Sequence, residues 1–515
     1  MLSPAHLRAS YSGRKLTIAS VFVPSTEEIS ERALGMVSGQ SEGEDYRAAL
    51  CELTDGGFLF ETEVYPERVF SFRHPLTREV AYSTQLAEQR ATTHAATART
   101  LIELNPDRHD ELAALVARHM EAGEETLEAA RWSARAAYWA GSSRPQDALR
   151  LWRKAMELTE ELEENEETLA MAVMSRLQQL DFAWRLGMDD EEEERLTAEA
   201  EEIATRTGDL RSLALLKVAT DVRPGMRRVA SGWLEAVRET IDLADASGDP
   251  HLRIAIRAAG SYAHLCTGDF DGFDRALDEV LELAGDDRRA GAGIIIGSPV
   301  AWATMAKGLV MRERGQLEDA EAQFNTALRI ATEEGDPEIA SWTRSNQALM
   351  LAMRGDLDAA IALARRNCEL TERLGDVFSR SLALSNLGGA QIAAGDYAAA
   401  LDSLEEAERV YRAAVSDGDE METWRAGLRA EALVGVGRGE EGLELAEWAT
   451  EVARERGMLW SLPLDLQALA IARTANGLDG AGAALDEAAE IAERTGARIS
   501  LQAVEMTRET LGAAR

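Results

Sequence analysis

Glycines recur from about residue 200 to the C-terminus with a period of about 40 residues, and this period constrains the fold more than any other feature. One series consists of Gly268, Gly315, Gly355, Gly395, Gly437 and Gly477. A second, interleaved series consists of Gly208, Gly248, Gly335 and Gly375, with weaker members at Gly418, Gly457 and Gly496. Two glycine turns per period, separated by amphipathic stretches of helical length, predict a stack of helical hairpins. Such stacks offer extended binding surfaces, so the period also favours a binding function.

The composition supports a helical chain and excludes some partners. Aromatic residues make up only 5% of the chain, which contains 11 prolines and is rich in alanine, leucine, glutamate and arginine. Its formal net charge of −36 repels nucleic-acid phosphates and anionic lipid headgroups. We therefore expect binding to neither nucleic acid nor membranes.

The sequence gives no indication of a cofactor or of export. Cys51, Cys266 and Cys368 are far apart and form no CxxC pair, which argues against a disulfide framework or a zinc site. No apolar run approaches the roughly 18 residues of a membrane span, and the first residues lack the layout of a signal peptide. We expect a cytoplasmic protein with no cofactor or metal.

Residues 1–90 differ from the rest of the chain. Helix-like stretches at about 26–38 and 44–55 precede two alternating segments, 58–64 and 69–74, which predict a β-hairpin. Pro75 then opens a helical segment that is expected to run through Leu104. Two or three helices followed by a hairpin correspond to the plan of a winged-helix domain.

We predict three parts along the chain: a winged-helix-like domain at 1–90, a helical connector with the first hairpins at 91–200, and repeats at 201–515. In the repeats, small residues recur where paired helices must approach closely, as at Gly308 with Ala320 and at Gly388 with Ala400. This pattern resembles the tetratricopeptide (TPR) consensus, lengthened to about 40 residues. The predicted fold class is all-α: a TPR-like helical-hairpin solenoid, wound as a right-handed superhelix, behind the small N-terminal domain.

A further resemblance lies at residues 65–82. An F-x-F-x-H-x-L-x-x-E-V-A-Y pattern is formed there by Phe70, Phe72, His74, Leu76, Glu79, Val80, Ala81 and Tyr82. It resembles the end of the winged-helix domain in bacterial AAA/STAND signalling ATPases, which often carry a cyclase or LuxR-type domain and a TPR-like tail. The resemblance implies a region that follows the ATPase core, and a signalling ATPase or cyclase as a partner.

Catalytic motifs are missing from the sequence. There is no G-x-x-x-x-G-K-[ST] loop to hold phosphates, no HExxH, no G-x-S-x-G, and no cyclase-like stretch. The TPR carboxylate clamp is also missing, because Leu309 and Gly389 stand where it needs asparagine. We expect a chain without enzymatic activity.

Three tryptophans share one position in the repeats. Trp302, Trp342 and Trp424 each lie 13 residues before a turn glycine of the first series. Equivalent positions form a stripe along a solenoid. The stripe predicts either a ligand groove, where tryptophan supplies rigid apolar contact area, or a seal between neighbouring hairpins.

The apolar linker at 292–299 lies in the one overlong period, and we expect it either to tuck into the solenoid or to form a contact loop. The sequence thus predicts a non-catalytic interaction or sensor module of a bacterial signalling system, which binds a peptide, protein or small ligand in the solenoid groove. The alternative is the regulatory C-terminal part of a cyclase or transcriptional-regulator ATPase whose catalytic domains are missing or lie on another chain.

Overall fold

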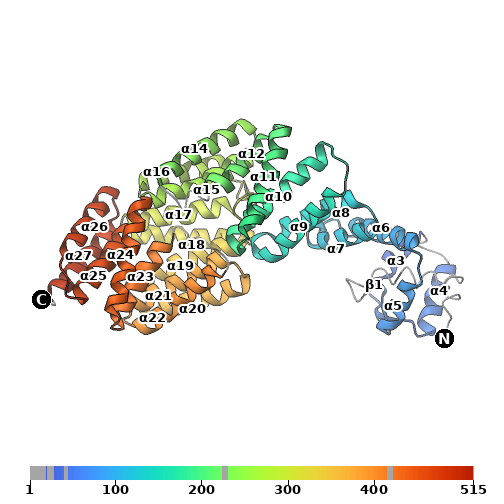
Figure 1. Ribbon diagram of the computed structural model, residues 1–515. Helices are drawn as coiled ribbons and strands as arrows, with labels where there is room; N and C mark the ends of the chain where they lie inside the picture. Colours follow the sequence, from blue (N-terminus) through green and yellow to red (C-terminus); the bar gives the residue numbers. More distant parts are fainter. Residues whose placement is uncertain are drawn as a thin grey trace. The chain divides into compact units, whose positions relative to one another are not determined.

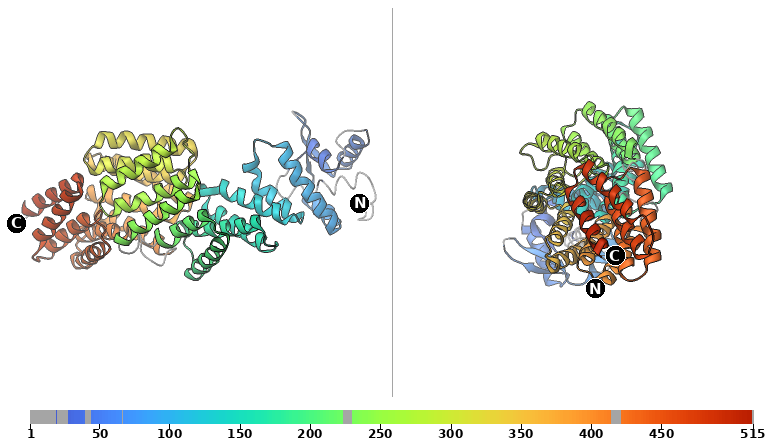
Figure 2. Two further views of the ribbon diagram at one scale, coloured as in Figure 1. Left: turned by 90° about the horizontal axis from the view of Figure 1, so that it is seen from above. Right: turned by 90° about the vertical axis from the view of Figure 1, so that its left-hand side faces the viewer.

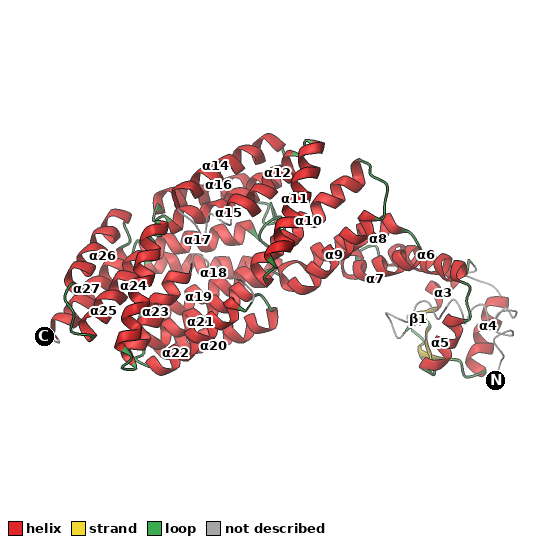
Figure 3. Cartoon of the chain, viewed as in Figure 1, coloured by secondary structure: helices red, strands yellow, loops and turns green. Residues whose placement is uncertain are grey.

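Alanine-rich amphipathic segments that end at glycine make the chain helical over most of its length (Figures 1 and 3). The computed structural model describes Ala19 and residues 28–39, 44–65, 67–222, 230–413 and 421–513. Two compact units are present, Met1–Trp139 with Ala148–Ser175, and Ala140–Asp147 with Arg176–Arg515. The three-part division expected from the sequence stays a prediction.

The first unit begins with a small sheet among helices. Its elements are β1 (Ile29–Ser30), α3 (Glu31–Val37), α4 (Glu44–Asp55), β2 (Leu59–Glu63), β3 (Val69–Phe72), α5 (Pro75–Ser83), α6 (Ala87–Leu104) and α7 (His109–Ala122), with most of α8 (Thr126–Ala140) and α9 (Pro145–Glu160). The 3₁₀ turn between the last two helices, η1 (Gly141–Ser143), belongs to the second unit. Helix α10 (Glu166–Leu186) has residues in both units.

The predicted hairpin is confirmed. Strands β2 and β3 pair antiparallel, with Leu59 opposite Phe72, and β1 adds to the other edge of β3 in the order β1-β3-β2. Leu59, Phe70 and Phe72 are buried against Tyr46 of α4. The alternation of the strands therefore supplies one apolar face for the unit's core. The assignment of this unit to the winged-helix class stays a prediction.

Two helix predictions in this unit are wrong. The stretch expected at 26–38 contains β1, and helix α3 starts only at Glu31, where the Ser30 hydroxyl caps the amide of Ala33 (3.1 Å); residues 26–27 lie outside the described part. The single helix expected from Pro75 to Leu104 is split into α5 and α6. The split lets the Tyr82 hydroxyl reach Nε2 of His94 on α6 (3.1 Å).

The pattern residues at 70–82 divide between core and surface. Phe70, Phe72 and Ala81 are buried, and Tyr82 is half-buried. His74, Leu76, Glu79 and Val80 are exposed. His94 and His119 are hydrogen-bonded through their Nδ1 atoms (2.9 Å), and burial lowers their pKa values to about 4 and about 3. The two imidazoles are therefore neutral near pH 7, and the Nδ1–H of one ring donates to the Nδ1 of the other.

The second unit is a stack of antiparallel helices that follow one another in sequence order (Figures 1 and 2). Its helices are α11 (Asp190–Thr207), α12 (Leu210–Lys217) with the π-helical turn η2 (Val218–Val222), α14 (Ala230–Ser247), α15 (Pro250–Cys266), α16 (Phe270–Ala284), α17 (Pro299–Glu313), α18 (Leu317–Glu334), α19 (Pro337–Met353), α20 (Leu357–Leu374), α21 (Val377–Ala393), α22 (Tyr397–Arg412), α23 (Glu422–Gly435), α24 (Gly439–Arg456), α25 (Leu462–Ala475), α26 (Ala481–Thr495) and α27 (Arg498–Ala513). This all-α, TPR-like solenoid is the predicted fold class.

The glycine period has a direct backbone cause. The six glycines of the first series lie between the helices of the hairpins α15–α16 to α25–α26, and all have left-handed φ values, for example +72° at Gly268 and +77° at Gly395. In the second series a left-handed glycine ends one helix. At Gly208, Gly248, Gly335 and Gly375 the following aspartate caps the next helix, as Asp336 caps α19. Only glycine adopts this conformation without strain, so the chain reverses where glycine stands. Gly418 lies outside the described residues.

Small residues then allow the paired helices to approach closely. A Cβ atom on Gly308 of α17 would lie 2.7 Å from the ring of Phe324 on α18, and one on Gly388 of α21 would lie 2.6 Å from Leu404 on α22. Two hairpins thus repeat the same contact between a glycine and a large side chain.

The early and late hairpins of the second unit meet along a line that we call the closing seam, formed by Cys266, Gly268, Leu459, Trp460 and Thr495. The backbone N–H of Trp460 donates to the carbonyl of Cys266 (3.3 Å). A Cβ on Gly268 would lie 2.8 Å from Cγ2 of Thr495 and 3.0 Å from Cβ of Leu459. One apolar core continues across the seam, because Trp233, Ala263 and Cys266 belong to the same buried cluster as Met458, Leu462 and Leu485.

No helix in the described part of the chain has both the length and the apolarity needed to cross a membrane.

The closing seam predicts unequal costs for two matched substitutions. Gly268→Ala and Gly395→Ala both place a side chain at a left-handed residue in equivalent turns of two repeats. The strained backbone alone costs about 1 kcal/mol in each variant. Nothing lies within 4 Å of a Cβ on Gly395, whereas one on Gly268 meets Leu459 and Thr495. We expect Gly268→Ala to lower the free energy of unfolding by at least about 1 kcal/mol more than Gly395→Ala. Equal losses in urea denaturation would contradict the tight seam.

Candidate ligand-binding pocket

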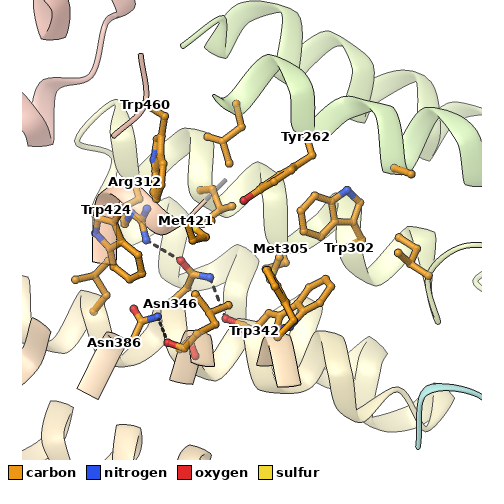
Figure 4. A pocket seen from close by; sticks show the side chains of 18 of the residues that line it. Tyr262, Trp302, Met305, Arg312, Trp342, Asn346, Asn386, Met421, Trp424 and Trp460 are labelled. Carbon is orange, nitrogen blue, oxygen red and sulfur yellow. Dashed lines mark hydrogen bonds between the residues drawn. The ribbon is translucent and has the colours of Figure 1, made fainter. Parts of the chain in front are cut away.

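The inward faces of the first helices of successive hairpins surround one cavity (Figure 4). The cavity has a volume of ≈ 200 Å³, which is room for several water molecules. Lining residues come from η2, α15, α17, α19, α21, α22 and α23 and from the segments before α17, α23 and α25: Val218, Val222, Ala259, Tyr262, Leu265, Ile295, Ile296, Trp302, Met305, Leu309, Arg312, Trp342, Ser345, Asn346, Leu349, Phe378, Leu382, Asn386, Tyr411, Met421, Trp424 and Trp460.

The three stripe tryptophans all line this cavity. Trp302 and Trp342 are each 7% exposed, and Trp424 is half-buried. The indole N–H of Trp302 donates to the carbonyl of Ala258 (2.9 Å), and that of Trp342 donates to the Ser379 hydroxyl (2.8 Å). These bonds fix the ring planes, so Trp302 and Trp342 pack neighbouring helices together and also present ring surface to the cavity. That they bind a ligand stays a prediction.

The tryptophans belong to a longer row of aromatic rings that the repeat spacing does not predict. Tyr262, Trp302, Trp342 and Phe378 stand edge-to-face in succession, with ring centroids 5.8, 5.9 and 5.7 Å apart. On the opposite wall Trp460 lies 6.1 Å from Trp424. Edge-to-face packing is the favoured geometry of such rings, and it stiffens the walls. Tyr262 and Trp460 do not occupy the 13-residue register, so only the tertiary structure brings them to the site.

Few polar groups reach the cavity, and the one charged side chain among them, Arg312, already forms an ion pair. The guanidinium of Arg312 is buried and binds the carboxylate of Glu313 (2.8 Å) and Oδ1 of Asn346 (2.7 Å). Nδ2 of Asn346 donates to the carbonyl of Trp342, and Nδ2 of Asn386 donates to that of Leu382 (both 2.9 Å). Asn346 and Asn386 are one repeat apart, so the repeat places two amides in matching positions on α19 and α21.

The apolar linker at 292–299 tucks into the solenoid, as one of the two expectations held. Ile295 and Ile296 are buried and line the cavity. Arg185, near the C-terminal end of α10, fixes the linker by donating to the carbonyl of Ile295 (3.2 Å). The same guanidinium forms buried ion pairs with Glu338 (2.8 Å) and Asp181 (2.9 Å). Breaking either ion pair would leave an uncompensated buried charge. These pairs therefore hold Arg185 in place, and its hydrogen bond to Ile295 holds the linker.

Two further buried carboxyl groups lie near this ion pair. Asp336 and Asp376 cap α19 and α21 one repeat apart. Burial, together with the charge of Glu338, raises the pKa of each to about 7. Oδ1 of Asp336 accepts the amide of Ile339 (3.1 Å), whereas its Oδ2 has no hydrogen-bond partner in the described structure. A group this buried favours its neutral form, in agreement with the raised pKa.

The described residues contain no cluster of three or more His, Cys, Asp or Glu side chains that could hold a metal ion. The other sequence-predicted residues lie elsewhere: the turn glycines sit at the ends of the hairpin helices, and the pattern residues at 70–82 belong to the first unit. The cavity wall consists mainly of aromatic and aliphatic side chains, with two amides, a few hydroxyl groups and one arginine that is paired with Glu313. Such a lining suits binding and orientation of an apolar group.

The fold and the cavity together define a TPR-like solenoid with an aromatic-lined pocket. A tetratricopeptide repeat model matches residues 299–373 and 338–413, which supply the centre of the pocket. No curated protein matches the chain in sequence.

The chain is also similar to several solved structures at low identity. A signal transduction ATPase with numerous domains (STAND) with a TPR sensor, from Pyrococcus horikoshii, is 12% identical, with a TM-score of 0.36 over 98% of this chain and 66% of that one. A Rap protein complexed with competence and sporulation factor is 12% identical, with a TM-score of 0.39 over 75% of this chain and 100% of that one. Yeast Tom70 is 14% identical, with a TM-score of 0.38 over 92% and 89%.

The raised pKa of Asp336 predicts a pH-dependent effect of removing its charge. Its folded pKa of about 7 lies above the unfolded value of 3.8, so its contribution to stability is present below about pH 4 and lost as the pH rises through 7. Asp336→Asn keeps the cap but cannot ionise. We expect the free energy of unfolding of this variant, relative to wild type, to rise by about 1 kcal/mol or more between pH 5 and pH 8.

The matched control is Asp396→Asn, which changes the exposed aspartate that caps α22. Urea denaturation of the full chain at both pH values measures the difference. A pH-independent effect of Asp336→Asn would show that Asp336 is ionised in the folded protein at pH 5. An equal pH dependence in the control would show that the effect does not come from the buried position of Asp336.

Proposed function

We propose that the second unit is a non-catalytic binding module of a signalling system, and that its ligand occupies the pocket lined by Trp302, Trp342 and Trp424. The observation that carries this proposal is their convergence: three tryptophans from one register of the repeat line a single cavity. A stripe needed only to seal neighbouring hairpins would not have to surround a shared space. The ligand classes compatible with a TPR-like groove are a peptide, a segment of a protein, or a small molecule.

Burial of apolar surface supplies the driving force for such binding. Each Å² of apolar surface removed from water contributes about 25 cal/mol, before the costs of association. The rings of Trp302 and Trp342 are held by hydrogen bonds and edge-to-face contacts, so these two side chains lose little conformational entropy when a ligand packs against them. Trp424 is half-buried in the unliganded protein and offers the largest gain in buried ring surface among the three.

A second candidate function rests on the first unit. The pattern at residues 70–82 resembles a domain that follows the ATPase core of bacterial signalling ATPases, and its Leu76 and Val80 are 69% and 39% exposed. Apolar side chains in such positions fit a surface that a partner domain covers. In this candidate the chain is the regulatory part of a cyclase or transcriptional-regulator ATPase, and ligand binding in the second unit regulates catalytic domains on the same or another polypeptide. The cytoplasm is the compartment that this role requires.

Two probes test the binding function on the full chain: neutral N-phenyl-1-naphthylamine and a dansylated amphipathic Leu/Lys peptide. We expect at least one to bind, and we expect Trp424→Ala to weaken that binding by about tenfold or more, because truncation of a tryptophan at the centre of a site costs about 2 kcal/mol. Fluorescence titration at about 0.15 M salt, where surface charges are largely screened, measures the affinity.

The matched control is Trp448→Ala, since Trp448 on α24 is 39% exposed and does not line this pocket. It should leave the affinity within about twofold of wild type. Thermal unfolding of both variants separates lost binding from lost structure. Failure of both probes to bind, or equal losses in the two variants, would overturn the proposed function.

A further inference from the structure

The closing seam determines what shape of ligand the pocket can accept. In an open solenoid, an extended peptide can run along the inner face from one end of the stack to the other. Here the end of α15 contacts the segment before α25. The N–H of Trp460 donates to the carbonyl of Cys266, and Gly268 packs against Leu459 and Thr495. Val222 from η2 and Trp460 from the segment before α25 therefore line the same cavity. The inner face is therefore bounded on the side where these early and late elements meet.

The charge of the lining is the second constraint on the ligand. The chain carries a formal net charge of −36, yet none of the described residues that line the pocket is Asp, Glu, Lys or His. The one ionised side chain, Arg312, is neutralised by Glu313 at 2.8 Å. A charged group on a ligand would lose its hydration without gaining an opposite charge, which disfavours both anions and cations.

The polar groups of the lining set the third constraint. Asn346 and Asn386 each use one amide N–H on a carbonyl of their own helix. Each amide has a second N–H, for which the described residues provide no partner. Two donors on neighbouring repeats are therefore available to an acceptor atom of a ligand, and the remaining surface around them is aromatic and aliphatic.

We propose that the pocket encloses a small, uncharged, mainly apolar molecule with ring or alkyl surface and a hydrogen-bond acceptor, and that it excludes extended peptides. This inference rests on the proposed function and narrows its ligand class. The molecule stacks against the indoles of Trp302, Trp342 and Trp424, and its acceptor atom takes a hydrogen bond from Asn346 or Asn386. The closing seam shields it from water on the side of the C-terminal hairpins.

The test compares a neutral probe with its charged analogue. N-phenyl-1-naphthylamine and 1-anilinonaphthalene-8-sulfonate have nearly the same ring framework, but only the second carries a sulfonate. We expect the neutral probe to bind the full chain at one molecule per chain with enhanced fluorescence, and the sulfonate to bind at least about tenfold more weakly. Native mass spectrometry measures the stoichiometry.

A cavity-filling variant locates the probe. Ala259 lines the pocket from α15, so Ala259→Trp should weaken binding of the neutral probe by about tenfold or more by occupying its space. The matched control is Ala359→Trp on the exposed face of α20, which should leave the affinity unchanged. If Ala259→Trp does not fold, as judged by circular dichroism, Leu349→Trp fills the same cavity from α19 and replaces it.

The outcomes separate this inference from the proposed function. Weaker binding of the neutral probe in the filled variant, with weak binding of the sulfonate and no competition by the Leu/Lys peptide, supports both. Peptide binding that depends on Trp424, without binding of the neutral probe, overturns the small-molecule inference and leaves the proposed function standing. Equal affinity for the two naphthalene probes, or binding of the neutral probe unaffected by filling the cavity, also overturns the inference. Absence of binding by every probe overturns both.

Discussion

The left-handed glycines between the helices are the constraint on which most of the second unit depends. A residue with φ near +70° reverses the chain after one helix, and the next helix can then start at once on a capping aspartate, as at Gly335 and Asp336. Because the reversal recurs every 40 residues or so, equivalent side chains return to the same face of successive hairpins. The three stripe tryptophans, the matching amides of Asn346 and Asn386 and the repeated buried caps Asp336 and Asp376 all follow from this spacing.

Rigid walls distinguish this pocket from a gap between helices. Hydrogen bonds hold the indoles of Trp302 and Trp342, and the guanidinium of Arg185 holds the linker that contributes Ile295. The electrostatics favour the same interpretation. None of the acidic residues that the structure describes lines the pocket, and Arg312 binds Glu313 and Asn346. An apolar surface with its charges already paired is the kind of lining that the proposed apolar ligand requires.

Local signals in the sequence predicted the structure reliably. The hairpin at β2–β3 was predictable because alternation of apolar and polar residues is a property of a few neighbouring positions, and the helical turns were predictable because glycine conformations are local. The two wrong helix predictions concern segments whose structure depends on contacts with residues far away in the sequence. Strand β1 forms because Ile29 and Ser30 pair with β3, about 40 residues away, and the break between α5 and α6 accompanies a contact from Tyr82 to His94. Secondary-structure propensity, which is judged over a few neighbouring residues, cannot predict either contact.

The sequence by itself determined the period, the all-α class and the register that Trp302, Trp342 and Trp424 share, since each depends on residues counted along one chain. Only the tertiary structure decided that this register faces a cavity, and that Tyr262, Trp460 and Ile295 complete its wall. It also decided that the stack closes at the seam of Gly268 with Leu459 and Thr495. The physical reason is that the curvature of the stack accumulates from small rotations between many hairpins. The sequence of a single repeat therefore does not determine where the early and late hairpins meet.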